Sequence, residues 1–308
     1  MGPRGMARHH RHLIDGADVI LLIGSRTNQN GTDSWSLLPE GATLIHLDAD
    51  PVEIGRNYEA LRLVGDARAT LGALREALGA QDLGPRRRAR PQLEAAVRTG
   101  RERHRAEAAD VLSSAARPIR PERLMRELDA LLTPETIVVA DASYASIWVG
   151  NYLRSRRPGQ RFLTPRGIAG LGWGLPLALG AKAARPDSPV VCLAGDGGFA
   201  HCWAELETAR RMALPVVLTV LNNQGLAYQR DAEDVLFGDH TDACAFTAVD
   251  HAEIARACGW HAERIEDPDT YRPALEAALA RHEPTLLDVV TDPAAYPPIT
   301  MFEGKLAP

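Results

Sequence analysis

Two short polar loops, each placed directly after an apolar run, carry the residues that could do chemistry. Gly195-Asp196-Gly197-Gly198 follows the apolar run 190–194, and Asn222-Asn223-Gln224-Gly225 follows the apolar run 215–221. A carboxylate, a side-chain amide and backbone carbonyls are the hard oxygen ligands that suit Mg²⁺. Glycine amides at a helix N-terminus suit a phosphate, and a cation would have to separate that phosphate from the Asp196 carboxylate. Together the loops predict a metal–diphosphate site, whereas either loop alone could be an ordinary turn of a sheet.

The elements that must hold these loops form a βαβ unit. The runs 190–194 and 215–221 are apolar and rich in β-branched residues, which is typical of parallel strands buried on both faces. Between them, apolar or small residues recur at helical spacing, namely Cys202, Trp203, Leu206, Ala209 and Ala213. Open α/β sheets bind ligands at the carboxyl ends of their strands, so we expect both loops at one edge of a parallel sheet.

The spacing of the two loops makes the chain resemble a known family. GDG at 195–197 followed by NN at 222–223, a span of 29 residues from Gly195 to Asn223, is similar to the cofactor motif of thiamine-diphosphate enzymes of the pyruvate-decarboxylase and acetolactate-synthase superfamily. The resemblance implies thiamine diphosphate and Mg²⁺ as cofactors, with the side chains of Asp196 and Asn223 and the Gly225 carbonyl as metal ligands. It also implies a cofactor cradle made by Gly195, Gly197, Gly198, Asn222, Gly225, Leu226 and Ala227.

The same resemblance assigns roles to two further segments. Ser143 and Tyr144 follow an expected strand at 136–140 and would face the diphosphate. In the glycine-rich turn that comes next, Leu171 would wedge the thiamine into its bent shape, and the Ala169 carbonyl would meet the aminopyrimidine.

The candidates for a substrate pocket are His201, Tyr228 and Gln229, which follow the GDGG turn and the NN loop. For His201, a position on a helix surface is an equal alternative. Trp148 matches a tryptophan of acetolactate synthases, but we expect it to pack in the core. The specificity tryptophan that acetolactate synthases usually carry after the NN loop is absent from this stretch, so the resemblance does not name the substrate.

The composition argues against several classes of protein. The net charge of −5 over 308 residues disfavours a generally basic nucleic-acid-binding surface. The four cysteines show no CxxC spacing, which favours reduced thiols over zinc sites or disulfides. No stretch is apolar for long enough to span a membrane, and the N-terminus lacks the apolar core of a signal peptide. We therefore expect a cytoplasmic protein with no nucleic-acid or membrane partner.

Patterns along the chain predict an α/β protein with two folded parts. The second is expected to be a parallel-sheet diphosphate-binding domain with helices on both faces, and the first a partial Rossmann-like central domain. The predicted segments are a flexible leader at 1–16, the partial central domain at 17–80, a linker with a charged helix at 81–120, the thiamine-diphosphate- and Mg²⁺-binding domain at 121–295, and a tail at 296–308. In the linker, the run Arg86-Arg87-Arg88 favours a solvated helix over a nucleic-acid site.

The partial central domain is predicted from three strand-like runs, at 17–24, 43–48 and 64–66. Asp66 is a candidate N-cap for a helix at 67–78, and a short helical stretch is expected at 50–54. The glycine fingerprint of dinucleotide-binding folds is missing after the first run, where the chain has Gly24-Ser25-Arg26. A nicotinamide site is therefore not expected.

Four short matches make this region similar to the second half of the central domain in the acetolactate-synthase family: GSR at 24–26, HLDADP at 46–51, EIG at 53–55 and VGDA at 64–67. Some members of that family bind FAD in this domain. Their acidic and arginine-containing stretch is replaced here by Thr27-Asn28-Gln29-Asn30-Gly31, so we expect FAD to be absent. In the second domain, further strands are expected at 136–140, 262–265 and 285–290, and helices at 121–132, 177–184, 250–258 and 268–281.

The resemblance covers the carboxyl half of the family's usual architecture. Family members also have an N-terminal domain that binds the aminopyrimidine ring and supplies an activating glutamate, and we identify no match to it in this sequence. We therefore expect no certain catalytic residue in this chain. We expect instead a partner polypeptide with the pyrimidine-binding domain, in a hetero-oligomer of the dimer-of-halves type. A shortened chain is the alternative.

The implied function is that of the diphosphate-binding subunit of a split, acetolactate-synthase-like enzyme. Such an enzyme would decarboxylate a 2-oxo acid such as pyruvate and ligate the acyl unit to an acceptor carbonyl. The alternatives are a 2-oxo-acid decarboxylase subunit and a non-catalytic cofactor-binding or regulatory relic. The intact GDG, NN and Leu171 positions argue against a relic. Nucleotide binding by a bare Rossmann-like fold is a further alternative that we favour less.

Overall fold

The computed structural model describes residues 10–28, 31–33, 35–165 and 167–297. They form two compact units, one ending at Ala108 and the other comprising Ala109–Pro297, and each is described by itself. Of the expected leader, residues 1–9 lie outside the described part, and residues 10–15 form a short helix. Most of the expected tail, 298–308, also lies outside it.

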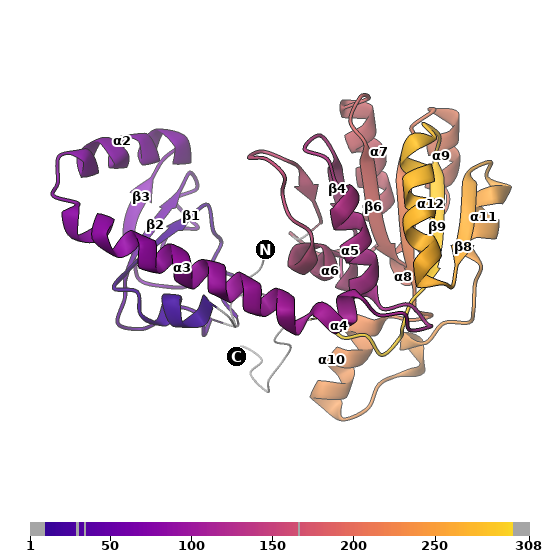
Figure 1. The fold of residues 1–308 in the computed structure, drawn as a ribbon, viewed down its shortest axis with the longest axis horizontal. Helices are drawn as coiled ribbons and strands as arrows, with labels where there is room; N and C mark the ends of the chain where they lie inside the picture. The colour runs from indigo at the N-terminus through magenta and orange to yellow at the C-terminus, as the bar shows by residue number, and fades with distance from the viewer. Residues whose placement is uncertain (1–9, 29–30, 34, 166, 298–308) are drawn as a thin grey trace. The chain divides into compact units, whose positions relative to one another are not determined.

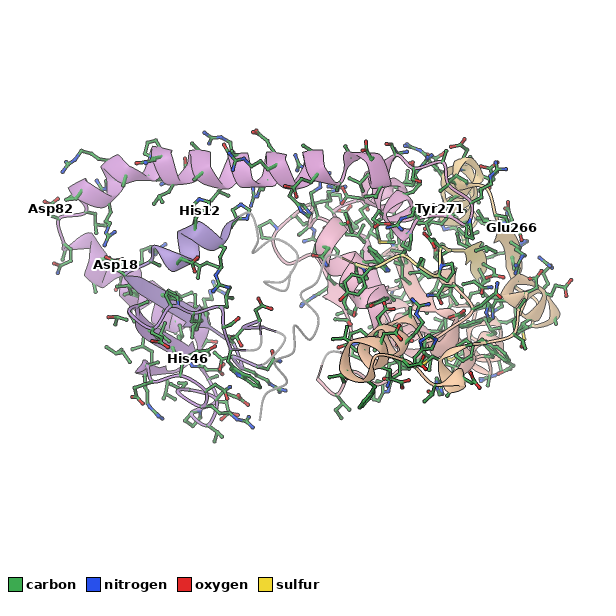
Figure 2. All side chains as sticks on the ribbon, turned by 90° about the horizontal axis from the view of Figure 1, so that it is seen from below. His12, Asp18, His46, Asp82, Glu266 and Tyr271 are labelled. Carbon is green, nitrogen blue, oxygen red and sulfur yellow. The ribbon has the colours of Figure 1, made fainter. Side chains whose placement is uncertain are left out.

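The first unit is built on a small parallel sheet in the strand order β1-β2-β3. Its elements are β1 (Val19–Ile23), β2 (Thr43–Asp48), β3 (Leu61–Val64), α2 (Ala67–Gly79) and α3 (Gly84–Glu107). The central strand is largely buried, with Leu47 at its core, whereas β1 and β3 are partly exposed. His46 of β2, labelled in Figure 2, is buried, and its Nε2 donates to the Ser25 carbonyl at 2.9 Å while its Nδ1 accepts from the Gly55 amide at 3.3 Å.

Aspartate side chains decide where the local structure of this unit becomes helical. The predicted cap at Asp66 is confirmed, because its carboxylate accepts from the Ala69 amide at 2.9 Å. The helical stretch expected at 50–54 is wrong, because this segment forms turns. Asp48 and Asp50 accept hydrogen bonds from the amides two residues further on, each at 2.9 Å. Such local bonds compete with helix formation.

The second unit contains a six-stranded parallel sheet in the order β5-β4-β6-β7-β9-β8. The strands are β4 (Ile137–Ala140), β5 (Phe162–Leu163), β6 (Val190–Gly195), β7 (Val217–Asn222), β8 (His261–Ile265) and β9 (Thr285–Val290). The strands at the centre of the sheet are buried on both faces, as all-apolar parallel strands must be.

Helices cover both faces of this sheet (Figure 1). On one face, α5 (Pro121–Leu131) packs against α12 (Pro268–Ala280), and the buried Tyr271 hydroxyl of α12 lies 3.2 Å from the Thr219 hydroxyl of β7. The opposite face is covered by α7 (Gly174–Ala184), α9 (Glu205–Arg211) and α11 (His251–Ala257). The remaining elements are α4 (Ala109–Leu112), α6 (Tyr144–Tyr152), α8 (Asp196–Ala200), α10 (Ala227–Phe237) and the 3-10 turn η1 (Asp242–Cys244).

The predicted α/β class, with a parallel sheet and helices on both faces, is confirmed. The predicted strands at 190–194 and 285–290 agree with β6 and β9 to within one residue. Helices α6 and α10 were not predicted. No helix of the described ranges combines the length and the apolar character needed to cross a membrane.

The order of the strands fixes where a ligand can bind. From β4 the chain passes to β5 on one side and then returns to β6 on the other side of β4. At such a reversal the loops after neighbouring strands diverge and leave a crevice at their carboxyl ends. Because β7 lies next to β6, three successive carboxyl ends meet at this edge of the sheet.

Candidate cofactor-binding site

A pocket lies at the carboxyl ends of β4, β6 and β7, where the two polar loops meet. It is lined by Pro121, Ala142, Ser143, Tyr144, Ala145, Trp148, Leu171, Gly195, Asp196, Gly197, Gly198, Leu221, Asn223, Gly225, Leu226, Ala227, Thr291, Asp292 and Ala295. All of these residues belong to the second unit. The fold thus brings the GDGG turn, the NN loop and the Leu171 turn into one cavity.

Asp196 is the most strongly perturbed acid of the pocket. Its side chain is only 4% exposed, and Oδ1 accepts from the Gly197 amide at 2.8 Å. Oδ2 is buried and has no hydrogen-bond partner among the described residues. Burial raises the pKa of this carboxyl to about 6, and the charge of Asp288 adds to the rise, although the amides of Gly197, Gln224 and Gly225 oppose it. A bound cation would supply the missing partner for Oδ2.

Asn223 and Gly225 complete the expected metal-ligand set, since both line the same pocket as Asp196. Hydrogen bonds to the segment that begins at the end of η1 hold the Gly225 turn in place. The Leu226 amide donates to the Cys244 carbonyl at 2.9 Å, and the Phe246 amide donates to the Gln224 carbonyl at 2.9 Å. A carboxylate, a side-chain amide and a carbonyl around an unpartnered buried oxygen fit a hard divalent cation such as Mg²⁺.

Asn222, the neighbouring asparagine, does not line the pocket. Its side chain is 1% exposed, and its Nδ2 donates to the Val249 carbonyl at 3.0 Å and to Asp288 Oδ1 at 2.9 Å. Asp288 Oδ2 in turn accepts from the His251 amide at 3.0 Å and from Arg264 at 3.1 Å. The geometry therefore places Asn222 in a buried network beneath the NN loop instead of in the diphosphate cradle.

The other predicted cradle residues do line the pocket, namely Gly195, Gly197, Gly198, Leu226 and Ala227. A β-carbon at Gly195 would meet no atom within 4 Å, which shows open space above this turn. Leu171 also lines the pocket, as a wedge under the thiamine would require. Ala169 does not, because it is exposed on the preceding stretch of the loop, where its φ is 62°.

Ser143 and Tyr144 line the pocket from the start of α6. Ser143 precedes the helix with φ 62° and ψ −147°. The Tyr144 hydroxyl donates to Asp231 Oδ2 at 2.5 Å, and burial together with Asp231 raises the pKa of this tyrosine far above its usual value. Tyr144 therefore enters the pocket as a neutral, fixed ring.

The three substrate-pocket candidates lie beside the pocket, and none of them appears among its lining residues. His201 is exposed, in agreement with the helix-surface alternative. Tyr228 packs edge-on against Tyr144 with ring centroids 5.6 Å apart, and Gln229 donates to Glu233 at 2.8 Å. Trp148 is buried and stacks on Tyr152, as core packing requires, and it also lines the pocket.

Sequence reasoning missed the side of the pocket that comes from the start of α5 and the end of β9. These lining residues are Pro121, Thr291, Asp292 and Ala295. Asp292 pairs with Arg120 at 3.1 Å. Because β9 is parallel to β7, its carboxyl end had to reach the same edge of the sheet, and this was the available signal.

Comparison with known proteins gives two family matches. Residues 141–289 match the thiamine pyrophosphate enzyme, C-terminal TPP binding domain, and residues 1–74 match the thiamine pyrophosphate enzyme, central domain.

Three curated relatives carry similar names. The probable acetolactate synthase large subunit of Methanocaldococcus jannaschii is 28% identical over 303 residues, which cover 96% of this chain and 50% of the relative. The acetolactate synthase isozyme 2 large subunit of Escherichia coli K12 is 28% identical, with 91% and 48% covered. The probable acetolactate synthase of Mycobacterium bovis is 34% identical, with 83% and 46% covered. The chain thus spans about half the length of these relatives.

Proposed function

The chain belongs to the thiamine-pyrophosphate enzymes, in the superfamily of the acetolactate synthases, and on this premise we propose that it is the diphosphate-binding part of an acetolactate-synthase-like enzyme. The proposed reaction is decarboxylation of a 2-oxo acid such as pyruvate, followed by ligation of the acyl unit to an acceptor carbonyl. The proposed cofactors are thiamine diphosphate and Mg²⁺.

One observation carries this proposal. A buried carboxylate oxygen of Asp196 lacks a partner among the described residues, and it lies in one pocket with Asn223 and Gly225. A free phosphate would be repelled by this carboxylate, whereas a phosphate that arrives with a divalent cation would not. The pocket therefore suits a metal-bound diphosphate better than a bare anion.

The residues of this chain would bind and orient the cofactor. Bound thiamine diphosphate supplies the electron sink that allows the bond between the carbonyl carbon and the carboxylate of a 2-oxo acid to break. Asp196, Asn223 and the Gly225 carbonyl would hold Mg²⁺. The Gly198 amide would donate to a phosphate oxygen, while the Gly197 amide donates to Asp196 Oδ1. Leu171 would support the apolar ring end of the cofactor, which lies beyond the diphosphate.

We further propose that a partner polypeptide supplies the activating glutamate that the family resemblance implies. The carboxylates among the described lining residues are those of Asp196 and Asp292, and neither is a glutamate. Asp196 is committed to the metal in this proposal, and Asp292 is paired with Arg120. The pocket thus offers a cofactor cradle and leaves proton transfer at the ring to another group.

Calorimetric titration tests the cofactor assignment. Thiamine diphosphate should bind in the presence of Mg²⁺ and lose its affinity when EDTA removes the metal, whereas ADP with Mg²⁺ should bind far more weakly. Asp196→Ala should abolish the metal-dependent binding, and the exposed Asp187→Ala is the matched control. Unchanged affinity in Asp196→Ala would overturn the site assignment.

Turnover of pyruvate tests the partner proposal. The purified chain alone should release no carbon dioxide from pyruvate above background, and activity should appear when the pyrimidine-binding polypeptide is added. Clear turnover by the isolated chain would contradict the need for a partner without affecting the cofactor assignment.

A further inference from the structure

Asp141 is a buried carboxylate that none of the cofactor contacts above uses. It is the first residue after β4, and its side chain is 1% exposed. Its oxygens accept four backbone hydrogen bonds, three of which come from one remote turn. The Gly172 amide donates to Oδ2 at 3.0 Å, and the amides of Trp173 and Gly174 donate to Oδ1, each at 3.2 Å. The fourth comes from the adjacent Ala142 amide at 2.9 Å.

Through these hydrogen bonds Asp141 caps the N-terminus of α7, although the two lie far apart in the sequence. Trp173 is the N-cap of α7 and makes no side-chain cap bond of its own. The first amides of a helix lack acceptors within the helix, and a carboxylate placed there satisfies them and complements the helix dipole. Asp141 therefore fixes the point at which α7 begins. Leu171, which lines the pocket, immediately precedes the amides that Asp141 holds.

The Asp141 carboxylate also packs closely against the GDGG turn. A β-carbon at Gly198 would lie 2.2 Å from Asp141 Oδ2, and one at Gly174 would lie 2.9 Å from Asp141 Cβ. Contacts this short leave room only for glycine, so Gly198 of the GDGG turn and Gly174 at the start of α7 both pack directly against Asp141. The Asp141 side chain thus lies between the turn that follows Leu171 and the GDGG turn, which also approach each other directly, since a β-carbon at Gly172 would lie 3.5 Å from the Gly198 carbonyl oxygen and 2.6 Å from His201 Cβ.

We infer that Asp141 is a positioning residue that fixes the position of Leu171 relative to the GDGG turn at 195–198. This inference rests on the proposed function. It assigns to Asp141 control over the ring end of thiamine diphosphate, which Leu171 supports, while the diphosphate end depends on Asp196 and Asn223. Asp141 is not among the described residues that line the pocket, so it would act through the backbone of the turn that follows Leu171.

Asp141→Asn removes this control with little change in volume. The asparagine amide has one acceptor oxygen, and its NH₂ group would face backbone N–H donors that the second carboxylate oxygen now satisfies. A donor left without an acceptor in a buried site is costly, so the Leu171 turn should shift away.

Two probes in calorimetry, each with Mg²⁺, separate the ends of the cofactor. We expect Asp141→Asn to weaken the binding of thiamine diphosphate by about tenfold or more, the effect of one lost buried contact, and to leave the binding of inorganic pyrophosphate within about threefold of wild type. Equal affinity for both probes in variant and wild type would overturn this inference alone. An equal loss for both probes would indicate a general structural role and would also overturn it. Failure of the wild type to bind thiamine diphosphate would overturn the proposed function and this inference with it.

A double-mutant cycle tests whether Asp141 acts through Leu171. Leu171→Ala should itself weaken thiamine diphosphate binding, and adding Asp141→Asn to it should change the affinity by less than about threefold, because the wedge is already gone. Multiplicative losses in the double variant would overturn the proposed route.

Gly174→Ala tests the same interaction by changing a residue that packs against Asp141. The methyl of Gly174→Ala would push against Asp141 Cβ, so this variant should reproduce the selective loss even if Asp141→Asn does not fold. Gly180→Ala is the matched control, because it lies on the same helix and a β-carbon there would meet no atom within 4 Å. Selective loss in Gly180→Ala, or unchanged binding of thiamine diphosphate in Gly174→Ala, would contradict the inference.

Discussion

At the scale of single residues, the buried carboxylate of Asp196 lowers the stability of the folded protein. The same carboxylate provides the oxygen that is proposed to bind the cation. The Asp196 carboxyl has an ordinary pKa of 3.8 and a pKa of about 6 in the fold, mainly because it is buried. The folded state therefore binds the proton more tightly than the unfolded state. Stability falls as the pH rises from about 4 to 6, and the full cost of the buried charge is present at pH 7.

Asp196→Asn should therefore stabilise the metal-free protein at pH 7. The pKa shift corresponds to roughly 2 to 3 kcal/mol in the free energy of unfolding. The gain should shrink as the pH falls through 6 and vanish below pH 4, where the wild-type carboxyl is protonated in both states. Denaturant melts at pH 3.5, 5 and 7 would show this trend. A variant that is less stable than wild type at pH 7 without metal would contradict it.

Asp288 is a buried carboxylate that accepts hydrogen bonds from three groups around it. Removing its carboxylate in Asp288→Ala leaves Asn222 Nδ2, the His251 amide and the Arg264 guanidinium without their shared acceptor. We expect a loss of about 2 to 4 kcal/mol in the free energy of unfolding, measured by urea denaturation. Glu266→Ala is the matched control, because Glu266 pairs with the same Arg264 but is 67% exposed. Its loss should be below about 1 kcal/mol, and an equal loss in both variants would contradict a special role for Asp288.

The NN pair shows what the sequence could predict about single residues and what it could not. The motif placed Asn223 in the pocket, where the structure has it. It also placed Asn222 there, although Asn222 ends β7 and successive side chains of a strand point to opposite sides. The partner that turns Asn222 away, Asp288, comes from a strand 66 residues later. Only strand pairing shows that the two residues are neighbours. The same reason hid Asp141, three of whose four hydrogen-bond donors lie more than 30 residues away.

At the scale of elements, α10 and the loop behind it hold the Gly225 turn in place. Glu233 of α10 accepts from the Thr241 amide at 2.8 Å and from Gln229 at 2.8 Å. These bonds, led by that of the Thr241 amide, lower the pKa of Glu233 to about 2. The stabilisation is present above the ordinary pKa of 4.5 and is lost as the pH falls towards 2.

Glu233→Gln should loosen this loop at neutral pH. A neutral amide accepts more weakly from the Thr241 amide than a carboxylate does. Hydrogen exchange followed by mass spectrometry should therefore show faster exchange in peptides that cover 238–246, with little change elsewhere. Glu253→Gln on α11 is the control, since Glu253 is exposed and lies outside the loop 238–246. Unchanged exchange at 238–246 would show that the loop is held by other contacts.

Elements with a plain physical signature could be predicted, and the others could not. The strands β6 and β9 are buried on both faces and are therefore apolar runs of strand length. Helix α6 has apolar residues around most of its circumference because it is enclosed, so no amphipathic stripe marks it. Helix α10 lies in the stretch after the NN loop, which was expected only to contribute candidates for a substrate pocket.

At the scale of the whole molecule, the cofactor pocket is confined to one of the two compact units. Every described residue that lines it lies between Pro121 and Ala295. The first unit has its own small sheet around β2, and none of its described residues is among those that line the pocket. The linkage between binding and stability should therefore act on the second unit.

Thiamine diphosphate with Mg²⁺ should protect the two units unequally. At a ligand concentration of 100 times Kd, the second unit should gain about 2.7 kcal/mol. Hydrogen exchange of the full chain should slow in peptides covering 195–200 and 222–228 and remain unchanged in peptides covering 43–48. Equal protection of both regions would contradict a site confined to the second unit.

The parallel pairing of β4, β6 and β7 also has a kinetic consequence. The loops that form the pocket come together only after strands far apart in sequence have paired, and such contacts form slowly. A ligand that recognises the assembled pocket cannot assist the earlier steps. It should therefore leave the refolding rate nearly unchanged and act on the unfolding rate, lengthening the lifetime of the folded chain. In the cell, the cofactor would slow the unfolding of chains that have already folded and would not speed the folding of newly made chains.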